Sequence, residues 1–128
     1  MHPDSEKKIL SIIIPVYNEE ENIKIAYDAL SSVMLRIQNK YDYELLFTDN
    51  HSTDNTFEIL RELSKIDSHI RAIRFSRNFG YQRSILMGYT HAAGNMAVQI
   101  DCDLQDPPEV ILEFLKKWEM GYEVIYGV

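Results

Sequence analysis

The chain has 128 residues and a formal net charge of −7, from 13 Lys and Arg against 20 Asp and Glu. This length suits one domain with a single core, and the acidic balance argues against a nucleic-acid-binding protein. No apolar run is long enough to span a bilayer, and Cys102, the only cysteine, excludes an internal disulfide and a cysteine-based zinc site.

Short β-branched runs alternate along the chain with segments of helical period. Strands are predicted over residues 10–15, 43–48, 70–75, 96–100 and 123–127. After each of the first four strands, apolar residues recur three or four positions apart, as at Ile23, Ala26 and Leu30, which indicates an amphipathic helix. This alternation predicts βαβ units, and therefore an α/β fold with a mostly parallel sheet covered on both faces.

Residues that commonly cap helix N-termini stand before three of these helices. We expect Asn18 to cap the first helix, Thr53 or Asp54 the second, and Asp106 the fourth, where two prolines follow. The last predicted strand has no helix after it, so we expect the sequence to be the N-terminal part of a longer protein, with its C-terminal part missing.

The polar, motif-like segments all follow strands. They read PVYNEE, TDNHSTDN, SRNFG and DCDLQDPP. The carboxyl ends of parallel strands meet at one edge of a sheet, and ligands bind at that edge in α/β proteins. We therefore expect these four segments to form one site.

The acidic segment QIDCDLQDPPE raises an electrostatic question, because like charges held close together repel each other. Asp101 and Asp103 point to the same side if the backbone is extended, and Gln105 continues the alternation. Two carboxylates and an amide oxygen suit Mg²⁺ or Mn²⁺, so a divalent-metal site is predicted, with a solvated turn as the alternative. A helix start accounts for Asp106 and Glu109.

Two other segments carry groups suited to a nucleotide. Tyr17 offers a ring for stacking, while Asn18 and Glu19 offer polar contacts. Asp49 and Asn50 could accept hydrogen bonds from a base or a ribose. An ordinary helix start and an Asx-rich turn would explain the same residues without any ligand.

Charge is segregated along the chain, because no Asp or Glu occurs between Ser68 and Ile100, where four arginines and two histidines lie. Two interpretations remain open: these side chains pair with acids elsewhere, or they form a positive patch for an anionic ligand. In the second, Arg77 and Arg83 could clamp a diphosphate.

No glycine-rich phosphate loop occurs, which argues against a P-loop NTPase. Cys102, between two acids, is expected to have a raised thiol pKa.

Four segments together resemble one family, in the same order and over nearly the whole chain: LSIIIPVYNEEENI, ELLFTDNHSTDNT, RFSRNFGYQRSILMGYTHAAGN and QIDCDLQDPPEVI. They look like family 2 inverting glycosyltransferases, in particular the polyprenyl-phosphate glycosyltransferases, which include dolichol-phosphate mannose synthases. The resemblance implies a Rossmann-like GT-A three-layer sandwich, in which residues 1–128 form a truncated nucleotide-sugar-binding domain.

The resemblance also implies roles for individual residues. The expected nucleotide-sugar-binding residues are Pro15, Tyr17, Asn18, Glu19, Asp49, Asn50, Arg77, Arg83, Asp101 and Cys102. The expected metal ligands are Asp101, Asp103 and Gln105. The metal, Mg²⁺ or Mn²⁺, would neutralise charge developing on the departing nucleotide. The family usually has two acids where this chain has Asp49 and Asn50, so the base stays open.

The implied reaction is a metal-dependent, inverting transfer of a sugar from a UDP- or GDP-sugar to a polyprenyl phosphate at the cytoplasmic face of a membrane. In the family, the catalytic base and acceptor segment lie downstream of the position of Val128. We therefore expect membrane contact through the missing part and no turnover by this fragment alone. A glycan-extending transferase for capsule or lipopolysaccharide and a non-catalytic nucleotide-binding module are alternatives. A homo-oligomer formed through the sheet edge is also compatible with the sequence.

Overall fold

A computed structural model describes residues 7–121 of the chain. Its elements in order are β1 (Lys8–Val16), α1 (Ile23–Leu35), β2 (Tyr41–Asp49), α2 (Thr56–Ile66), β3 (Ile70–Arg74), α3 (Tyr81–His91), β4 (Met96–Gln99) and α4 (Val110–Glu119). These elements confirm the predicted alternation of strand and helix. The strand predicted over residues 123–127 lies outside the described residues.

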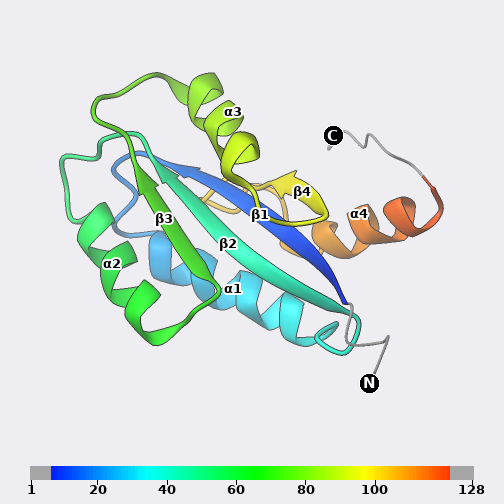
Figure 1. Cartoon of the computed structure of the whole chain (residues 1–128). Coiled ribbons are helices and arrows are strands. Elements are labelled where there is room, and N and C mark those ends of the chain that lie inside the picture. The colour runs from blue at the N-terminus through cyan, green and yellow to red at the C-terminus, as the bar shows by residue number, and fades with distance from the viewer. Residues whose placement is uncertain (1–6, 122–128) are drawn as a thin grey trace.

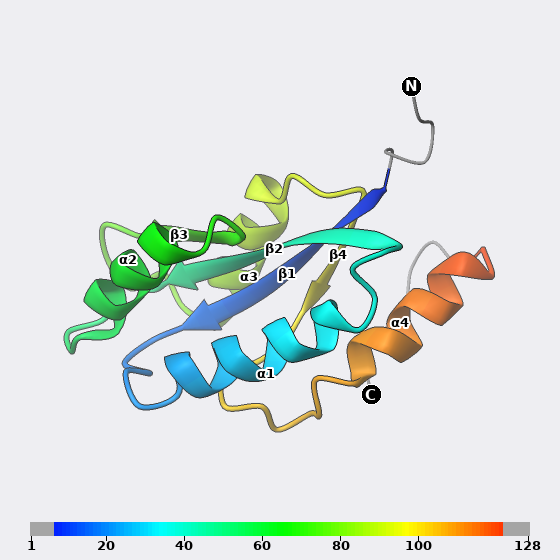
Figure 2. The ribbon, with the colours of Figure 1, turned by 90° about the horizontal axis from the view of Figure 1, so that it is seen from below.

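The four strands form a parallel sheet in the order β3-β2-β1-β4. Figure 1 shows α3 on one face of this sheet, and Figure 2 shows α1 and α4 on the opposite face, with α2 beside β3. The predicted α/β class with a parallel sheet between helical layers is therefore confirmed. Because the chain runs from β1 outward to β3 and then returns to the other side of β1, the strand order reverses between β1 and β4. Such a switch point is where α/β sheets bind ligands.

The central strands are apolar because both of their faces are covered. Ile12 and Ile14 belong to the core cluster shared with α1, whereas Ile13 faces α3, and none of the three is exposed. Helix α3 lies close to the sheet because Gly88 has no side chain: a Cβ there would lie 2.4 Å from Ile13 Cγ2. Between the same layers, the hydroxyls of Ser84 and Thr48 are 2.9 Å apart. These contacts hold the start of α3 beside the carboxyl ends of the strands.

The predicted cap of the first helix is wrong. Helix α1 begins at Ile23, and Asn18 lies well before it with a left-handed φ of 52°. Its side chain instead tethers two loops, because Asn18 Oδ1 accepts from the backbone N–H of Thr53 at 2.8 Å. The Asn18 backbone N–H donates in return to Ser52 Oγ at 2.9 Å.

The other two cap predictions differ in outcome. The N-cap of α2 is Asn55 and not Thr53 or Asp54, although Asp54 Oδ1 accepts from the backbone N–H of Thr56, the first residue of α2, at 2.9 Å and so satisfies a helix-terminal donor. Asp106 does not cap α4, which begins at Val110 without a side-chain cap. A tight turn precedes α4 instead, in which the N–H of Val110 donates to Pro107 O at 3.0 Å. Within residues 7–121, no helix has the length and apolar character that crossing a bilayer requires.

Candidate functional site

A pocket of about 530 Å³ lies at the switch point between β1 and β4. Its size falls within the range of small-molecule sites. The residues that line it are Pro15, Val16, Tyr17, Glu19, Asn50, Asn78, Gly80, Tyr81, Ser84, Asp101, Cys102 and Asp103. All four segments that we expected to meet contribute to the lining, the segment that follows β2 through Asn50 alone, and Tyr81 and Ser84 of α3 add to them. The sequence prediction of one shared site at this edge is thus supported by the pocket.

The end of β1 and the residues that follow it form one side of the pocket. Pro15, Tyr17 and Glu19 line it, and the ring of Tyr17 is half exposed, as stacking on a planar ligand requires. Glu19 is fastened on both sides, since its N–H donates to Thr56 Oγ1 at 2.8 Å and its Oε1 accepts from Asn22 Nδ2 at 2.9 Å. Asn18, which was expected among the binding residues, does not line the pocket.

The two polar residues at the end of β2 differ in what remains free. Asp49 is fully buried: Oδ1 accepts from the N–H and hydroxyl of Ser52 at 3.0 and 2.6 Å, while Oδ2 makes no hydrogen bond and lies 3.7 Å from Arg74 Nε. The Asn50 amide is occupied at both ends. Its Nδ2 donates to Asn78 Oδ1, and its Oδ1 accepts from the N–H of Phe79, both at 2.8 Å.

The SRNFG loop enters the pocket through its second half. Gly80 has a φ of 92°, a left-handed conformation that favours glycine, and it leads directly into α3. Its N–H donates to Asn78 Oδ1 at 2.8 Å, so Asn78 and Asn50 together hold the loop. Arg77 lies over the ring of Phe79, 4.7 Å from its centre, and does not line the pocket. Arg83 is an exposed residue of α3 and also lies outside the lining.

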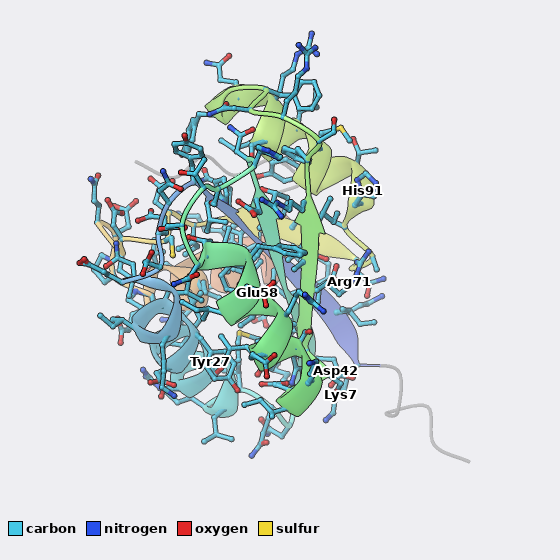
Figure 3. All side chains as sticks on the ribbon, turned by 90° about the vertical axis from the view of Figure 1, so that its left-hand side faces the viewer. Lys7, Tyr27, Asp42, Glu58, Arg71 and His91 are labelled. Carbon is cyan, nitrogen blue, oxygen red and sulfur yellow. The ribbon has the colours of Figure 1, made fainter. Side chains whose placement is uncertain are left out.

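Two arginines of the acid-free segment pair with acids, as the first interpretation predicted, and the positive patch for an anion stays a prediction. Arg71 pairs with Glu44 at 2.6 Å and also donates to the backbone O of His91 at 3.1 Å; Figure 3 shows these two basic residues as neighbours. Arg74 lies 3.7 Å from Asp49. Arg77 and Arg83 have no acidic partner within residues 7–121, so they are the cations left for an anion.

Asp101 and Asp103 both line the pocket, but not by the route that the sequence suggested. The predicted extended backbone is wrong: residues 101–104 form a turn in which the N–H of Leu104 donates to Asp101 O at 3.1 Å, and Leu104 has a φ of 55°. Gln105 therefore lies outside the lining. It still contacts the acids, because its Nε2 donates to Asp103 Oδ2 at 3.1 Å.

The turn carries two pocket-lining carboxylates, those of Asp101 and Asp103, that a divalent cation could use. No cluster of three or more His, Cys, Asp or Glu side chains that could hold a metal occurs in the described part of the chain. Two carboxylates with an amide oxygen suit Mg²⁺ or Mn²⁺ better than zinc, because these ions keep several waters and take further oxygens from phosphates. Asp101 Oδ2 makes no hydrogen bond in residues 7–121 and is free to bind such an ion.

Cys102 lines the pocket, but its thiol is unreactive. Its side chain is buried, and burial, followed by the charges of Glu19, Asp103 and Asp101, raises the pKa of the thiol to about 12. The raised thiol pKa predicted from the flanking acids is therefore confirmed, with burial as the larger cause. A thiol that stays protonated is a poor nucleophile.

Five lining residues are absent from the expected binding residues: Val16, Asn78, Gly80, Tyr81 and Ser84. Val16 and Asn78 lie within strand-end segments that were predicted to form the site, but they were not singled out as binding residues. Tyr81 and Ser84 were overlooked because the third helix was inferred from apolar residues that begin later, although α3 starts at Tyr81. The available signal was Tyr81 directly after the SRNFG loop, followed three positions later by the polar residue Ser84.

Comparison with known proteins places the chain in a family. Residues 11–128 match the family model described as Glycosyl transferase family 2. The chain belongs to this family. The glycosyltransferase YkcC of Bacillus subtilis (strain 168) is 54% identical over 118 residues, which are 92% of this chain and 36% of YkcC. An undecaprenyl-phosphate 4-deoxy-4-formamido-L-arabinose transferase of Proteus mirabilis is 36% identical over 117 residues, which are 91% of this chain and 35% of that protein.

A solved structure supports the fold. The mannosyltransferase PcManGT from Pyrobaculum calidifontis, in complex with GDP-Man and Mn²⁺, superposes with a TM-score of 0.72 at 20% identity, covering 88% of this chain and 33% of that one. At this identity the likeness speaks for the fold alone, and it confirms the predicted glycosyltransferase architecture. The family 2 chain spans about a third of the length of these relatives.

Proposed function

We propose that residues 1–128 form the donor-binding domain of a metal-dependent family 2 glycosyltransferase that uses a UDP- or GDP-sugar. The observation that carries this proposal is the meeting of Asp101 and Asp103 with the segment after β1 in one pocket at the switch point. Family membership supports glycosyl transfer. The pocket offers room for a small ligand between a tyrosine ring and an acidic turn, and an anionic ligand there would need a cation to offset the charges of Glu19, Asp101 and Asp103.

The nucleoside would occupy the side of the pocket formed by β1 and β2. Tyr17 offers its half-exposed ring for stacking. Asp49 Oδ2 is a buried acceptor without a hydrogen bond, a situation that costs free energy unless a donor arrives. An N–H of the base would supply that donor. The Asn50 amide already binds Asn78 and Phe79, so Asp49 is the other candidate for reading the base. Asp49 lies outside the pocket lining with Oδ2 3.7 Å from Arg74 Nε, so Arg74 would have to move for the base to reach it.

The diphosphate would bind on the β4 side. Asp101, Asp103 and Gln105 would hold Mg²⁺ or Mn²⁺, whose charge stabilises the departing nucleoside diphosphate when the ion is bound. Arg77 and Arg83, which lack acidic partners within the described residues, would approach the phosphates after a loop or side-chain movement. Gly80, at the start of α3, lets the backbone come close to the ligand.

The acceptor is proposed for the whole protein, since the chain spans about a third of its relatives. A relative that is 36% identical is named as an undecaprenyl-phosphate transferase, which favours a polyprenyl phosphate as acceptor here. A phosphate acceptor is already anionic, so it needs less help from a general base than a hydroxyl does. We place this reaction at the cytoplasmic face of the membrane, with the catalytic base and membrane contact outside residues 1–128. A glycan-extending reaction or a purely nucleotide-binding role is the alternative.

Calorimetry tests the proposal directly. The chain is titrated with UDP, GDP and their sugars, with Mn²⁺ and then with EDTA in its place. We expect binding of one nucleotide class that requires the metal and that falls about a hundredfold in Asp103→Ala, since that variant loses a charged ligand. Asp106→Ala is the matched control, because Asp106 is exposed on the same loop but does not line the pocket.

The outcomes separate the candidate functions. Metal-dependent binding that is lost only in Asp103→Ala supports the donor-binding site. Equal binding with and without metal would contradict the metal site and favour a non-catalytic nucleotide-binding module. A folded chain that binds none of the nucleotides would overturn the proposed function altogether.

A further inference from the structure

Three polar side chains beside the pocket form a closed hydrogen-bonded group. The Tyr81 hydroxyl donates to Asp101 Oδ1 at 2.5 Å. Gln99 Nε2 donates to the same carboxylate oxygen at 2.8 Å and to the Tyr81 hydroxyl oxygen at 3.1 Å. The single hydroxyl proton is therefore given to Asp101, while the tyrosine oxygen accepts from the amide. Asp101 Oδ1 receives two donors.

The two oxygens of Asp101 thus have different surroundings. Oδ1 is saturated by Tyr81 and Gln99, whereas Oδ2 makes no hydrogen bond within residues 7–121. A carboxylate bound at one oxygen loses its freedom to rotate, and its second oxygen then takes a defined position. Here the carboxylate lines the pocket.

We propose that Tyr81 and Gln99 are positioning residues, which hold Asp101 in one orientation so that Oδ2 is presented to the metal–diphosphate group. This inference rests on the proposed function and adds two residues to it. Neither residue belongs to the metal-binding set that the family resemblance implied. Their role is exerted through Asp101.

The position of Tyr81 in the fold argues against a purely structural role. Its side chain is 54% exposed, so its ring contributes little to the core. As the first residue of α3, Tyr81 follows Gly80 and precedes Ser84, which contacts Thr48 of β2. Its backbone is therefore held firmly while its hydroxyl reaches Asp101.

A double-mutant cycle on nucleotide binding tests this role. The variants are Tyr81→Phe, Asp101→Asn and both together, and Tyr89→Phe is the matched control, since Tyr89 lies on α3 outside the pocket and its hydroxyl makes no hydrogen bond in the described chain. Calorimetry measures their affinities for UDP and GDP in Mn²⁺, and thermal unfolding verifies that each variant is folded. We expect Tyr81→Phe to weaken binding about tenfold, as for loss of a hydrogen bond to a charged group.

The cycle separates positioning from direct contact. In the Asp101→Asn background, Tyr81→Phe is expected to change the affinity by less than about twofold, because the two residues act as one unit. Tyr89→Phe should match the unmodified chain. If Tyr81→Phe binds as tightly as the unmodified chain, or if its tenfold loss persists beside Asp101→Asn, the positioning role is wrong while the proposed function stands. If the unmodified chain binds neither nucleotide, both are overturned.

Discussion

Acidic side chains at the amino and carboxyl ends of the sheet differ in how completely they are hydrogen-bonded within the fold. Near the amino end, Glu44 of β2 is buried and saturated: it accepts from Ser11 Oγ at 2.5 Å, from the N–H of Ala93 at 2.7 Å and from Arg71 Nη1 at 2.6 Å. At the carboxyl end, Asp49 and Asp101 each keep one oxygen without a hydrogen bond in residues 7–121.

This difference separates a structural acid from acids that are available to a ligand. Glu44 of β2 is hydrogen-bonded to Ser11 of β1, to Arg71 of β3 and to Ala93 in the loop before β4, so its charge is used within the fold. Buried polar groups are normally paired, and an exception calls for an explanation. A bound nucleotide would provide it for the buried Asp49, whereas Asp101 is only partly buried and keeps an oxygen that a metal could use. The comparison therefore predicts that changes at one end alter stability and that changes at the other alter binding.

The largest effect on stability is expected at Glu44. Glu44→Gln keeps one acceptor oxygen but turns an amide toward Arg71, so the free energy of unfolding should fall by about 2 kcal/mol. Urea unfolding measures the loss, and nucleotide affinity should stay within about twofold. If Glu44→Gln instead lowers affinity without changing stability, the proposed division between the two ends is wrong.

Acid should produce the same effect without mutation. Burial alone would raise the pKa of Glu44, but hydrogen bonds from Ser11, Ala93 and Arg71 outweigh it and lower the pKa below its ordinary value. The stabilisation is then present above the unfolded pKa, about 4.3, and is lost as pH falls through the lower folded pKa. The difference in unfolding free energy between the unmodified chain and Glu44→Gln should therefore be constant above about pH 4.3 and shrink as pH falls below it. A difference that does not shrink on further acidification would exclude Glu44 as its source.

A smaller effect is expected at Asn50, which stands at the carboxyl end but serves the loop. Asn50→Ala removes two hydrogen bonds to Asn78 and Phe79, which should cost about 1 kcal/mol and weaken nucleotide binding severalfold. Asn55→Ala is the control, since the Asn55 side chain makes no capping hydrogen bond. Hydrogen exchange at the N–H of Phe79 measures the loosened loop. Equal exchange in both variants would argue against the tethering role.

The smallest effect is expected at an exposed pair far from both ends. Glu58 and Arg61 of α2 lie 3.0 Å apart with exposed side chains, and Figure 3 shows Glu58 on that helix. Solvent screens such pairs, so Glu58→Ala should change the free energy of unfolding by less than about 0.5 kcal/mol. Thermal unfolding at low and high salt measures it. A larger change would mean that surface charge contributes to stability as much as the buried Glu44 group does.

The order of residues along the chain is enough to predict most elements and the edge of the sheet at which the site lies. Apolar runs such as residues 10–15 predict strands covered on both faces, because only a buried strand is apolar on both sides. The alternation with helices then predicts parallel strands, whose carboxyl ends must meet. Asp101 and Asp103 could be assigned to the site on this ground alone, since they directly follow a predicted strand.

Tertiary structure alone decided which polar atoms remain free. Asn18 and Asn50 look like ligand-binding amides in sequence, yet Asn18 holds the N–H of Thr53 and Asn50 holds Asn78 and Phe79. Tyr81 reaches Asp101 across 20 positions of sequence because α3 packs on β1, which is also the strand that β4 pairs with. Local sequence specifies backbone conformation through short-range sterics and periodicity, whereas hydrogen-bond partners distant in the chain depend on how the layers pack.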